Sequence, residues 1–269
     1  MLIRDLLLLA ENSRYLPRLL ASSTPTNVEF RETFSEIGHL EEQGVTATQL
    51  LKGLVSGQGA FNKTGGEVFA VGPYNHPKEV WIFVNGILTD RDMAVRNALA
   101  LSNIFRRTIT VLHNPTHGII PDLVESTFSR TFDNDCPVTK DLYAEVMGAL
   151  LDGKKVKVIG HSQGGIIVSR LLNRFKLTEQ DMFKKLEVYT FASGADEDVE
   201  VKGVYQEHFA NSDDFVCRIG MIHVQPKSNL YVRKEVGHLL NRDYLEHFAG
   251  GHFCGKLSRL FKYVGGKHG

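Results

Sequence analysis

The sequence predicts an α/β protein with a mostly parallel central sheet flanked by helices and with a helical extension at its N-terminus. Three observations support this fold class. The chain has 269 residues, of which 42% are hydrophobic and 23% charged, so it can bury a sizeable core. From about residue 67, short β-rich runs alternate with helical runs, which is typical of parallel βαβ units. The runs 80–84 and 158–159 are continuously apolar, as expected of strands that are covered on both faces.

Residues 1–62 are predicted to form the helical extension, and residues 63–269 the main domain. Leucines recur near helical spacing at the start of the extension, and two further helical stretches are expected at 29–40 and 46–54. Two interpretations stay open for this extension. It is either a segment that packs on the main domain, or a lid, or a surface that makes peripheral contact with a membrane or a partner.

The main domain is predicted to alternate strands with helices. In chain order, we expect a strand at 67–71, a strand at 79–85, a helix at 91–106, a strand at 108–113, a helix at 141–151, a strand at 155–159, a helix at 164–175, and strands at 186–192 and 204–211. Because the strands alternate with helices of this length, they are expected to pair in parallel.

The charge balance gives no sign of a nucleic-acid partner, and the cysteines give no sign of a metal site. The chain has 31 Lys plus Arg and 31 Asp plus Glu, so no overall charge excess points to nucleic acid. Cys136, Cys217 and Cys254 are far apart and lack metal-ligand spacing. Free thiols are the economical interpretation, with one disulfide plus a free thiol as the alternative. No motif calls for a metal or an organic cofactor.

The N-terminal apolar run is short. It spans residues 6–10 and is bracketed by Asp5 and Glu11, whereas a cleaved signal peptide needs a longer apolar stretch behind a positive start. No stretch reaches the roughly 18 apolar residues that span a bilayer. The sequence therefore predicts a soluble, cytoplasmic protein without a transmembrane helix, with export by a route that needs no cleaved signal as the alternative.

The motif Gly160-His161-Ser162-Gln163-Gly164 joins the strand at 155–159 to an apolar helix. A strand, a sharp turn and a helix are the context that gives a G-x-S-x-G match its meaning as a nucleophile elbow. The two glycines let strand and helix approach closely, and the serine is then exposed in a strained turn. We expect Ser162 to be a nucleophile and the Gln163 N–H to be an oxyanion donor. His161 is expected to shape the elbow rather than act as a base, because adjacent side chains diverge at a sharp turn.

A second oxyanion donor is expected after the strand that ends at residue 84. The segment Asn85-Gly86-Ile87 follows it, and a glycine there lets the backbone turn its amides inward. We predict the Ile87 N–H as the second donor, with Gly86 as the enabling residue. An ordinary βα turn is the alternative.

An acid is expected after a strand beyond the elbow, because in this arrangement the triad runs in the order Ser, Asp or Glu, His. Asp214 is favoured, since it comes just after the strand at 204–211 and Val216 then enters the core. Asp213 is the near alternative. Asp196 and Asp198 are weaker candidates and are expected to form a solvated turn.

The base must lie further downstream. His238 follows Gly237 on a loop that enters the last helical segment, so it can reach over the elbow while that segment anchors it. His252 is the next candidate. In this assignment His238 takes the Ser162 proton, and Asp214 fixes the imidazole tautomer.

Residues 67–250 resemble the α/β-hydrolase superfamily, and more narrowly its lipase-like branch. The segments 189–194 and 211–216 are similar to the strand and acid-bearing segments of class 3 lipases. The oxyanion segment departs from that pattern, because Asn85-Gly86-Ile87 is neither the His-Gly of many esterases nor the Arg-Gly-Thr type of class 3 lipases. The loop from His113 to Gly118 is expected either to line the site or to form a structural turn.

The resemblance implies a lipase- or esterase-like serine hydrolase that cleaves carboxylic esters through an acyl-enzyme. The implied substrate is a small-molecule or lipid ester. The alternatives are an acyltransferase or thioesterase that uses the same site, and a catalytically silent binding protein with the same fold.

Overall fold

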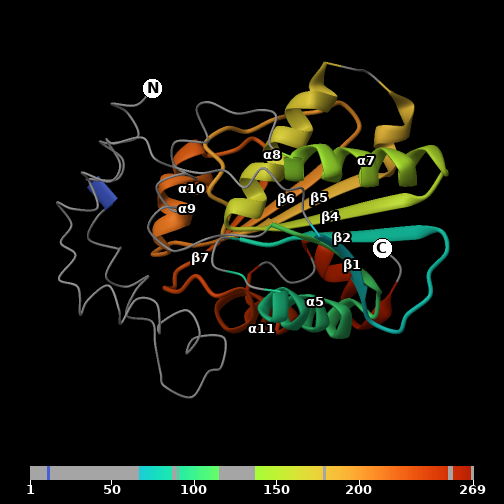
Figure 1. Cartoon of the computed structure of the whole chain (residues 1–269). Coiled ribbons are helices and arrows are strands. Elements are labelled where there is room, and N and C mark those ends of the chain that lie inside the picture. Colours follow the sequence, from blue (N-terminus) through green and yellow to red (C-terminus); the bar gives the residue numbers. More distant parts are fainter. Residues whose placement is uncertain are drawn as a thin grey trace, which may run out of the picture.

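The computed structural model describes residues 11–12, 67–86, 89, 91–114, 137–177, 180–253 and 257–267. In them, one sheet is formed by the strands β1 (Glu67–Val71), β2 (Glu79–Val84), β3 (Ile109–His113), β4 (Lys155–His161), β5 (Leu186–Phe191), β6 (Tyr205–Asn211) and β7 (Asn229–Arg233). Their order is β1-β3-β2-β4-β5-β6-β7 (Figure 1). β1 is antiparallel to β3, and every other neighbouring pair is parallel. The sheet confirms the predicted fold class.

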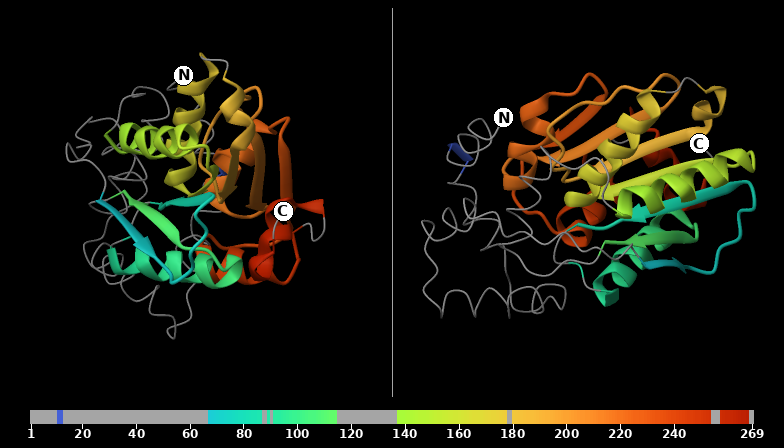
Figure 2. Two further views of the ribbon diagram at one scale, coloured as in Figure 1. Left: turned by 90° about the vertical axis from the view of Figure 1, so that its right-hand side faces the viewer. Right: turned by 45° about the horizontal axis from the view of Figure 1, so that its top comes forward.

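Helices cover both faces of the sheet. One face carries α7 (Pro137–Leu151) and α8 (Gln163–Lys176), and the other carries α5 (Arg91–Phe105), η3 (Leu240–Leu245), α11 (Glu246–Ala249) and η5 (Leu260–Gly266). The shorter elements are η2 (Asp181–Lys185), α9 (Phe215–Ile219) and α10 (Met221–Val224). Figures 1 and 2 show α7 and α8 together on one side of the strands, with α5 and α11 on the opposite side.

Side-chain alternation along β2 divides the core into two parts. Trp81 and Phe83 pack toward α5, whereas Ile82 and Val84 pack toward α7 and α8. All four are at most 1% exposed. Because successive side chains of a strand point to opposite faces, a strand covered on both faces must be apolar throughout. This explains the continuous apolar run at residues 80–84.

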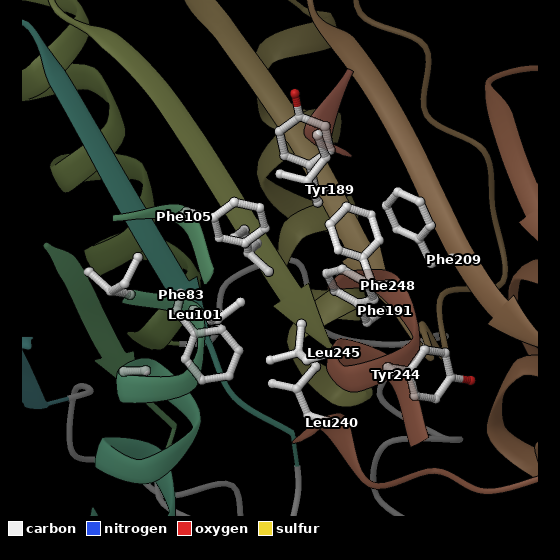
Figure 3. Close-up of a cluster of buried hydrophobic side chains, with 14 of the residues drawn as sticks. Phe83, Leu101, Phe105, Tyr189, Phe191, Phe209, Leu240, Tyr244, Leu245 and Phe248 are labelled. Atoms are coloured by element: carbon white, nitrogen blue, oxygen red, sulfur yellow. The ribbon is translucent and has the colours of Figure 1, made fainter. Parts of the chain in front are cut away.

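Aromatic side chains fill the core on the α5 side, beneath the carboxyl ends of the central strands (Figure 3). The rings of Phe191 and Phe209 stack with centroids 4.8 Å apart. Phe248 contacts both rings edge-on, at 5.5 Å and 5.0 Å. Such pairs prefer these stacked and edge-to-face arrangements. This packing anchors the C-terminal helical segment against β5 and β6.

The structure differs from the prediction at β7 and at the start of α7, and it adds the short elements η2, α9, α10 and η5. β7 is missing from the predicted strands, because this edge strand is only partly buried and its short sequence has no strong alternation. α7 begins at Pro137 rather than at residue 141, and proline is well suited to the first turn of a helix.

The predicted N-terminal extension, residues 1–62, lies outside the described residues apart from Glu11 and Asn12. The Asn12 side chain accepts a hydrogen bond from Arg218 Nε of α9 at 3.1 Å. No helix in the described part of the chain is long and apolar enough to cross a membrane.

Three described histidines on the strands are buried: His113 on β3, His161 on β4 and His208 on β6. On β6, His208 lies with Nδ1 2.7 Å from Thr190 Oγ1, and its Nε2 has no hydrogen-bond partner among the described residues. Burial lowers the pKa of His208 to about 4. At the end of β4, burial and the neighbouring His238 lower the pKa of His161 to about 3. The imidazoles of His161 and His208 are therefore neutral in the folded protein at neutral pH.

We expect the free energy of unfolding to fall as the pH is lowered from 7 to 5. Below about pH 6.5 the unfolded chain binds protons on histidines that stay neutral in the fold, so acid favours unfolding by about 1.4 kcal/mol per pH unit for each such group. At pH 5 the loss is about 2 kcal/mol for His208 alone. Urea denaturation of the His208→Gln variant at both pH values should show a pH dependence smaller by that amount.

The matched control is His223→Gln, which removes an exposed histidine. It should keep the wild-type pH dependence of unfolding. An equal pH dependence in wild type and His208→Gln would show that His208 is not held neutral by its burial.

Candidate active site

Ser162 lies in the turn between β4 and α8, with φ 56° and ψ −119°. A non-glycine residue with this backbone conformation is strained, and strain of this kind concentrates at functional sites. The flanking glycines make the turn possible. A Cβ atom on Gly164 would lie 2.1 Å from the Val84 carbonyl oxygen, and one on Gly160 would lie 2.9 Å from the Gly164 carbonyl oxygen. The predicted elbow residues thus form a close strand–turn–helix junction.

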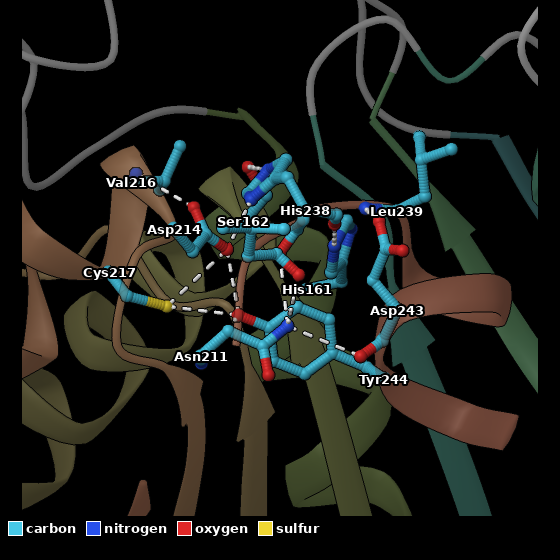
Figure 4. A network of polar contacts seen from close by, with 12 residues as sticks. His161, Ser162, Asn211, Asp214, Val216, Cys217, His238, Leu239, Asp243 and Tyr244 are labelled. Carbon is cyan, nitrogen blue, oxygen red and sulfur yellow. Dashed lines mark hydrogen bonds and ion pairs between the residues drawn. The ribbon is translucent and has the colours of Figure 1, made fainter. Parts of the chain in front are cut away.

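Three of the predicted side chains form one hydrogen-bonded chain (Figure 4). Ser162 Oγ lies 2.9 Å from His238 Nε2, and His238 Nδ1 lies 2.8 Å from Asp214 Oδ2. Asp214 follows β6, and His238 lies on the loop between β7 and η3. Because parallel strands end at the same edge of the sheet, residues after β4, β6 and β7 meet there although they are far apart in sequence.

The alternative acids and bases make other contacts. Asp198 accepts from the Lys227 backbone amide at 2.7 Å and from the Ser228 hydroxyl at 3.3 Å. His252 Nδ1 lies 3.3 Å from His247 Nδ1 at an exposed position. The carboxylate that contacts His238 is that of Asp214, one residue after the near alternative, Asp213.

Asp214 is almost fully buried and has a donor on each carboxylate oxygen. Its Oδ1 accepts from the Val216 backbone amide at 2.9 Å, so the side chain also caps the N-terminus of α9. Its Oδ2 accepts from the Tyr244 hydroxyl at 2.7 Å in addition to His238. A buried carboxylate needs such donors, because an unpaired charge in this position would be strongly destabilising.

Cys217 lies beside the same carboxylate, with Sγ 3.6 Å from Asp214 Oδ2. It is a free, buried cysteine, and burial raises the pKa of its thiol well above the ordinary value. The thiol therefore stays neutral. The predicted free state holds for this cysteine, while Cys136 and Cys254 lie outside the described residues.

The loop that carries His238 is fixed by side chains on both sides. Gly237 has φ +102°, and a Cβ there would lie 2.4 Å from Asp243 Cγ. Asp243 Oδ2 accepts from the Leu239 amide at 2.9 Å, and Asn211 Nδ2 donates to the Gly237 carbonyl at 3.0 Å. These contacts set the backbone immediately before and after His238.

His161 also contacts this loop. Its Nε2 lies 2.9 Å from the His238 carbonyl oxygen, so the neutral ring carries its proton on Nε2 and donates. The two imidazole rings have centroids 5.0 Å apart. His161 is thus a neighbour that holds the backbone of the loop that carries His238.

The segment after β2 lies directly against Ser162. A Cβ on Gly86 would lie 2.7 Å from Ser162 Cβ, so only glycine fits at this approach. Asn85 Nδ2 donates to the Gly86 carbonyl at 2.8 Å, and Asn85 Oδ1 accepts from the Asn114 amide at 2.7 Å. Ile87, the predicted second oxyanion donor, lies outside the described residues.

Gln163 is the first residue of α8, so its amide lies at a helix N-terminus, which favours negative charge. Its side chain is fixed by Asn114, whose Nδ2 donates to Gln163 Oε1 at 2.6 Å. Asn114 belongs to the segment 113–118, and residues 115–118 of that segment lie outside the described residues. The part that is described therefore contacts the edge of the site.

Sequence reasoning missed several residues that support the three side chains. They are Asn85, Asn114, Asn211, Asp243 and Tyr244. A partial signal exists for the last two, because Asp243 and Tyr244 follow closely after His238 and are polar positions in a buried helical segment. The asparagines give no signal, since their contacts join segments that are distant in sequence.

Residues 75–196 match a protein family described as "Putative serine esterase (DUF676)". No curated protein matches the chain in sequence. Three solved structures are distantly similar. An esterase from Pyrobaculum calidifontis is 9% identical, over 88% of this chain and 97% of that one, with a TM-score of 0.46. LpqC, a poly(3-hydroxybutyrate) depolymerase from Bordetella parapertussis, is 15% identical, over 73% and 85%, with a TM-score of 0.44. XC6422 from Xanthomonas campestris, described as an a/b serine hydrolase without lid, is 16% identical, over 70% and 92%, with a TM-score of 0.40.

Proposed function

We propose that the chain is a serine hydrolase of the α/β-hydrolase superfamily, related to lipases and esterases, and that it cleaves carboxylic esters through an acyl-enzyme on Ser162; the match of residues 75–196 to a family described as a putative serine esterase supports this. In this proposal His238 is the general base and Asp214 orients the imidazole. The observation that carries the proposal is the unbroken hydrogen-bonded chain from Ser162 Oγ through both nitrogens of His238 to the buried carboxylate.

The acylation step follows from these contacts. Ser162 Oγ attacks the ester carbonyl carbon while its proton moves to His238 Nε2, 2.9 Å away. Asp214 accepts the hydrogen bond from Nδ1 and stabilises the imidazolium that forms. The negative charge on the carbonyl oxygen is stabilised by the Gln163 amide at the start of α8, with the Ile87 amide as the second proposed donor. His238 then gives its proton to the leaving alcohol, and the acyl group stays on Ser162.

Deacylation repeats the sequence with water. His238 removes a proton from a water molecule, the hydroxide attacks the acyl carbon, and Ser162 leaves with the proton from His238. The products are a carboxylic acid and the free enzyme. The neutral net charge of the chain provides no long-range attraction for a strongly charged substrate, which is consistent with a neutral ester.

A fluorophosphonate probe tests the proposal, because it reacts with activated serine nucleophiles. We expect the wild-type protein to take up one probe molecule, and peptide mass spectrometry should place it on the peptide that contains Ser162. The reaction needs the deprotonated nucleophile that His238 provides. Turnover of p-nitrophenyl esters of increasing acyl length then defines the substrate class.

Two variants serve as controls. Ser162→Ala should take up no probe while keeping the wild-type circular dichroism spectrum, whereas Ser169→Ala, in the middle of α8, should be labelled like the wild type. The proposal is wrong if folded Ser162→Ala hydrolyses short and long esters at the wild-type rate.

A further inference from the structure

Tyr244 contacts the same carboxylate oxygen as His238 and is not used by the mechanism above. Its hydroxyl lies 2.7 Å from Asp214 Oδ2, and His238 Nδ1 lies 2.8 Å from that same atom (Figure 4). Both distances are those of hydrogen bonds to a charged acceptor. Two strong donors therefore share one oxygen of Asp214, in addition to the longer contact from the Cys217 thiol.

The hydroxyl of Tyr244 is held as a donor toward Asp214. It accepts a hydrogen bond from the Asn211 backbone amide at 3.0 Å, which leaves its own proton available to donate to Asp214 Oδ2. Burial and the nearby Asp214 raise the pKa of the Tyr244 hydroxyl well above its ordinary value, which keeps the group protonated. Its ring is fully buried and stacks on Phe253 with centroids 5.7 Å apart.

One short segment of the chain brings both donors to the carboxylate. His238 lies on the loop before η3, and Tyr244 lies within this π-helical turn. Asp243 closes the segment, because its side chain accepts from the Leu239 amide and its own amide donates to the Leu239 carbonyl. The π-helical turn brings the Tyr244 hydroxyl to the same carboxylate as His238, which lies six residues earlier in the sequence.

The surrounding ionisable groups do not supply the same contact. Those packed around His238 and Asp214 are His161 on β4, Cys217 on α9, Arg233 on β7, and Arg242 and Asp243 on η3. His161 is neutral and donates to a backbone carbonyl, while Arg242 pairs with Asp243 at 2.7 Å. Cys217 approaches Asp214 Oδ2 only to 3.6 Å, and a thiol is a weak donor.

We propose that Tyr244 is a positioning residue: by donating to the oxygen of Asp214 that also contacts His238, it weakens the interaction of that carboxylate with the imidazole. A carboxylate that accepts an additional hydrogen bond is a weaker acceptor for its other partner. Without the hydroxyl, Asp214 would stabilise the imidazolium more strongly, and His238 would stay protonated to higher pH. This inference rests on the proposed function, because it assigns the tuning of the proposed base.

NMR titration of the His238 ring in wild type and Tyr244→Phe tests the tuning without any substrate. The ring signal can be assigned by its loss in His238→Gln. We expect the titration midpoint in Tyr244→Phe to rise by about 0.5 to 1 pH unit, because the carboxylate loses a hydrogen bond from a second donor. A 3-fluorotyrosine at position 244 is a stronger donor and should lower the midpoint. It also keeps an acceptor for the Asn211 amide if Tyr244→Phe does not fold.

Kinetics provide the second readout. At pH 7, kcat of Tyr244→Phe should be lower, by up to about 3-fold for a midpoint rise of 0.5 pH unit and by up to about 10-fold for a rise of 1 unit, with KM within a factor of two, and it should return toward the wild-type value at pH 9. A merely structural role would lower kcat equally at both pH values. Phe253→Leu is the control for packing, since it loosens the contact with the Tyr244 ring but keeps the hydroxyl, and its midpoint should equal that of the wild type.

An unchanged titration midpoint in Tyr244→Phe, or a loss of kcat that does not depend on pH, would overturn the inference. Failure of the proposed function has a different signature. In that case the wild type would take up no fluorophosphonate probe, while the NMR titration would still report whether Tyr244 tunes His238.

Discussion

Replacing Asp214 by asparagine is expected to lower kcat for ester hydrolysis by about 10⁴-fold without unfolding the protein. The carboxylate accepts from the Val216 amide on Oδ1 and from His238 on Oδ2. An amide side chain has only one acceptor oxygen. If that oxygen stays on the Val216 amide, the NH₂ group faces His238 Nδ1, which must then become an acceptor. The imidazole proton moves to Nε2, so His238 can no longer remove the Ser162 proton.

Asp213→Asn is the matched control, because it makes the same chemical change one residue earlier. Its kcat should stay within about twofold of the wild type, since its carboxylate is not the one that contacts His238. Both variants are measured with the same p-nitrophenyl ester, with circular dichroism to confirm folding. A 10⁴-fold loss in Asp213→Asn together with an active Asp214→Asn would reverse the assignment of the acid.

The sequence predicts the elbow well because its information is local. Strand, turn and helix are contiguous from residue 155 to residue 175, and the glycines at 160 and 164 are needed by contacts within or next to that unit. The order Ser, Asp, His also restricts the acid and base to the C-terminal part of the chain. These constraints suffice to select Ser162 and a short set of downstream acids and histidines, which includes the Asp214 and His238 that the structure brings next to it.

The choice between Asp213 and Asp214 depends on tertiary structure. Both follow β6, and neither composition nor periodicity separates them. In the fold, Asp214 is the residue that caps α9 and points toward the loop after β7. Because β7 itself was not predicted, the position of the loop after β7 relative to β6 could not be predicted either.

The supporting polar residues are even less accessible to sequence reasoning. Asn85 and Asn114 join the loops after β2 and β3, and Asn211 joins β6 to the loop before His238. Each contact spans at least 25 residues of sequence, and asparagine is common in surface turns, so nothing local distinguishes these positions. A fold is needed before such residues can be separated from ordinary turn residues.

Gly164→Ala is expected to destabilise the protein by about 3 kcal/mol or more, a large part of the stability of a typical domain. The added Cβ would lie 2.1 Å from the Val84 carbonyl oxygen and 2.9 Å from the Asn85 carbonyl oxygen. These are backbone atoms at the end of the buried strand β2, so no side chain can move aside. Either α8 must shift away from the sheet or β2 must distort, and both changes also move the Ser162 turn. Thermal and urea unfolding measure the loss.

Gly148→Ala makes the same substitution in another helix and separates the clash from the helix propensity of alanine. Gly148 is exposed on α7, and a Cβ there would meet no atom within 4 Å. Alanine is the better helix former, so this variant should be more stable than the wild type by about 1 kcal/mol. If Gly148→Ala raises the free energy of unfolding and Gly164→Ala lowers it, the destabilisation of Gly164→Ala comes from the contact between α8 and β2. If Gly164→Ala unfolded at the wild-type urea concentration, the close approach of the elbow helix to β2 would not be a requirement of the fold.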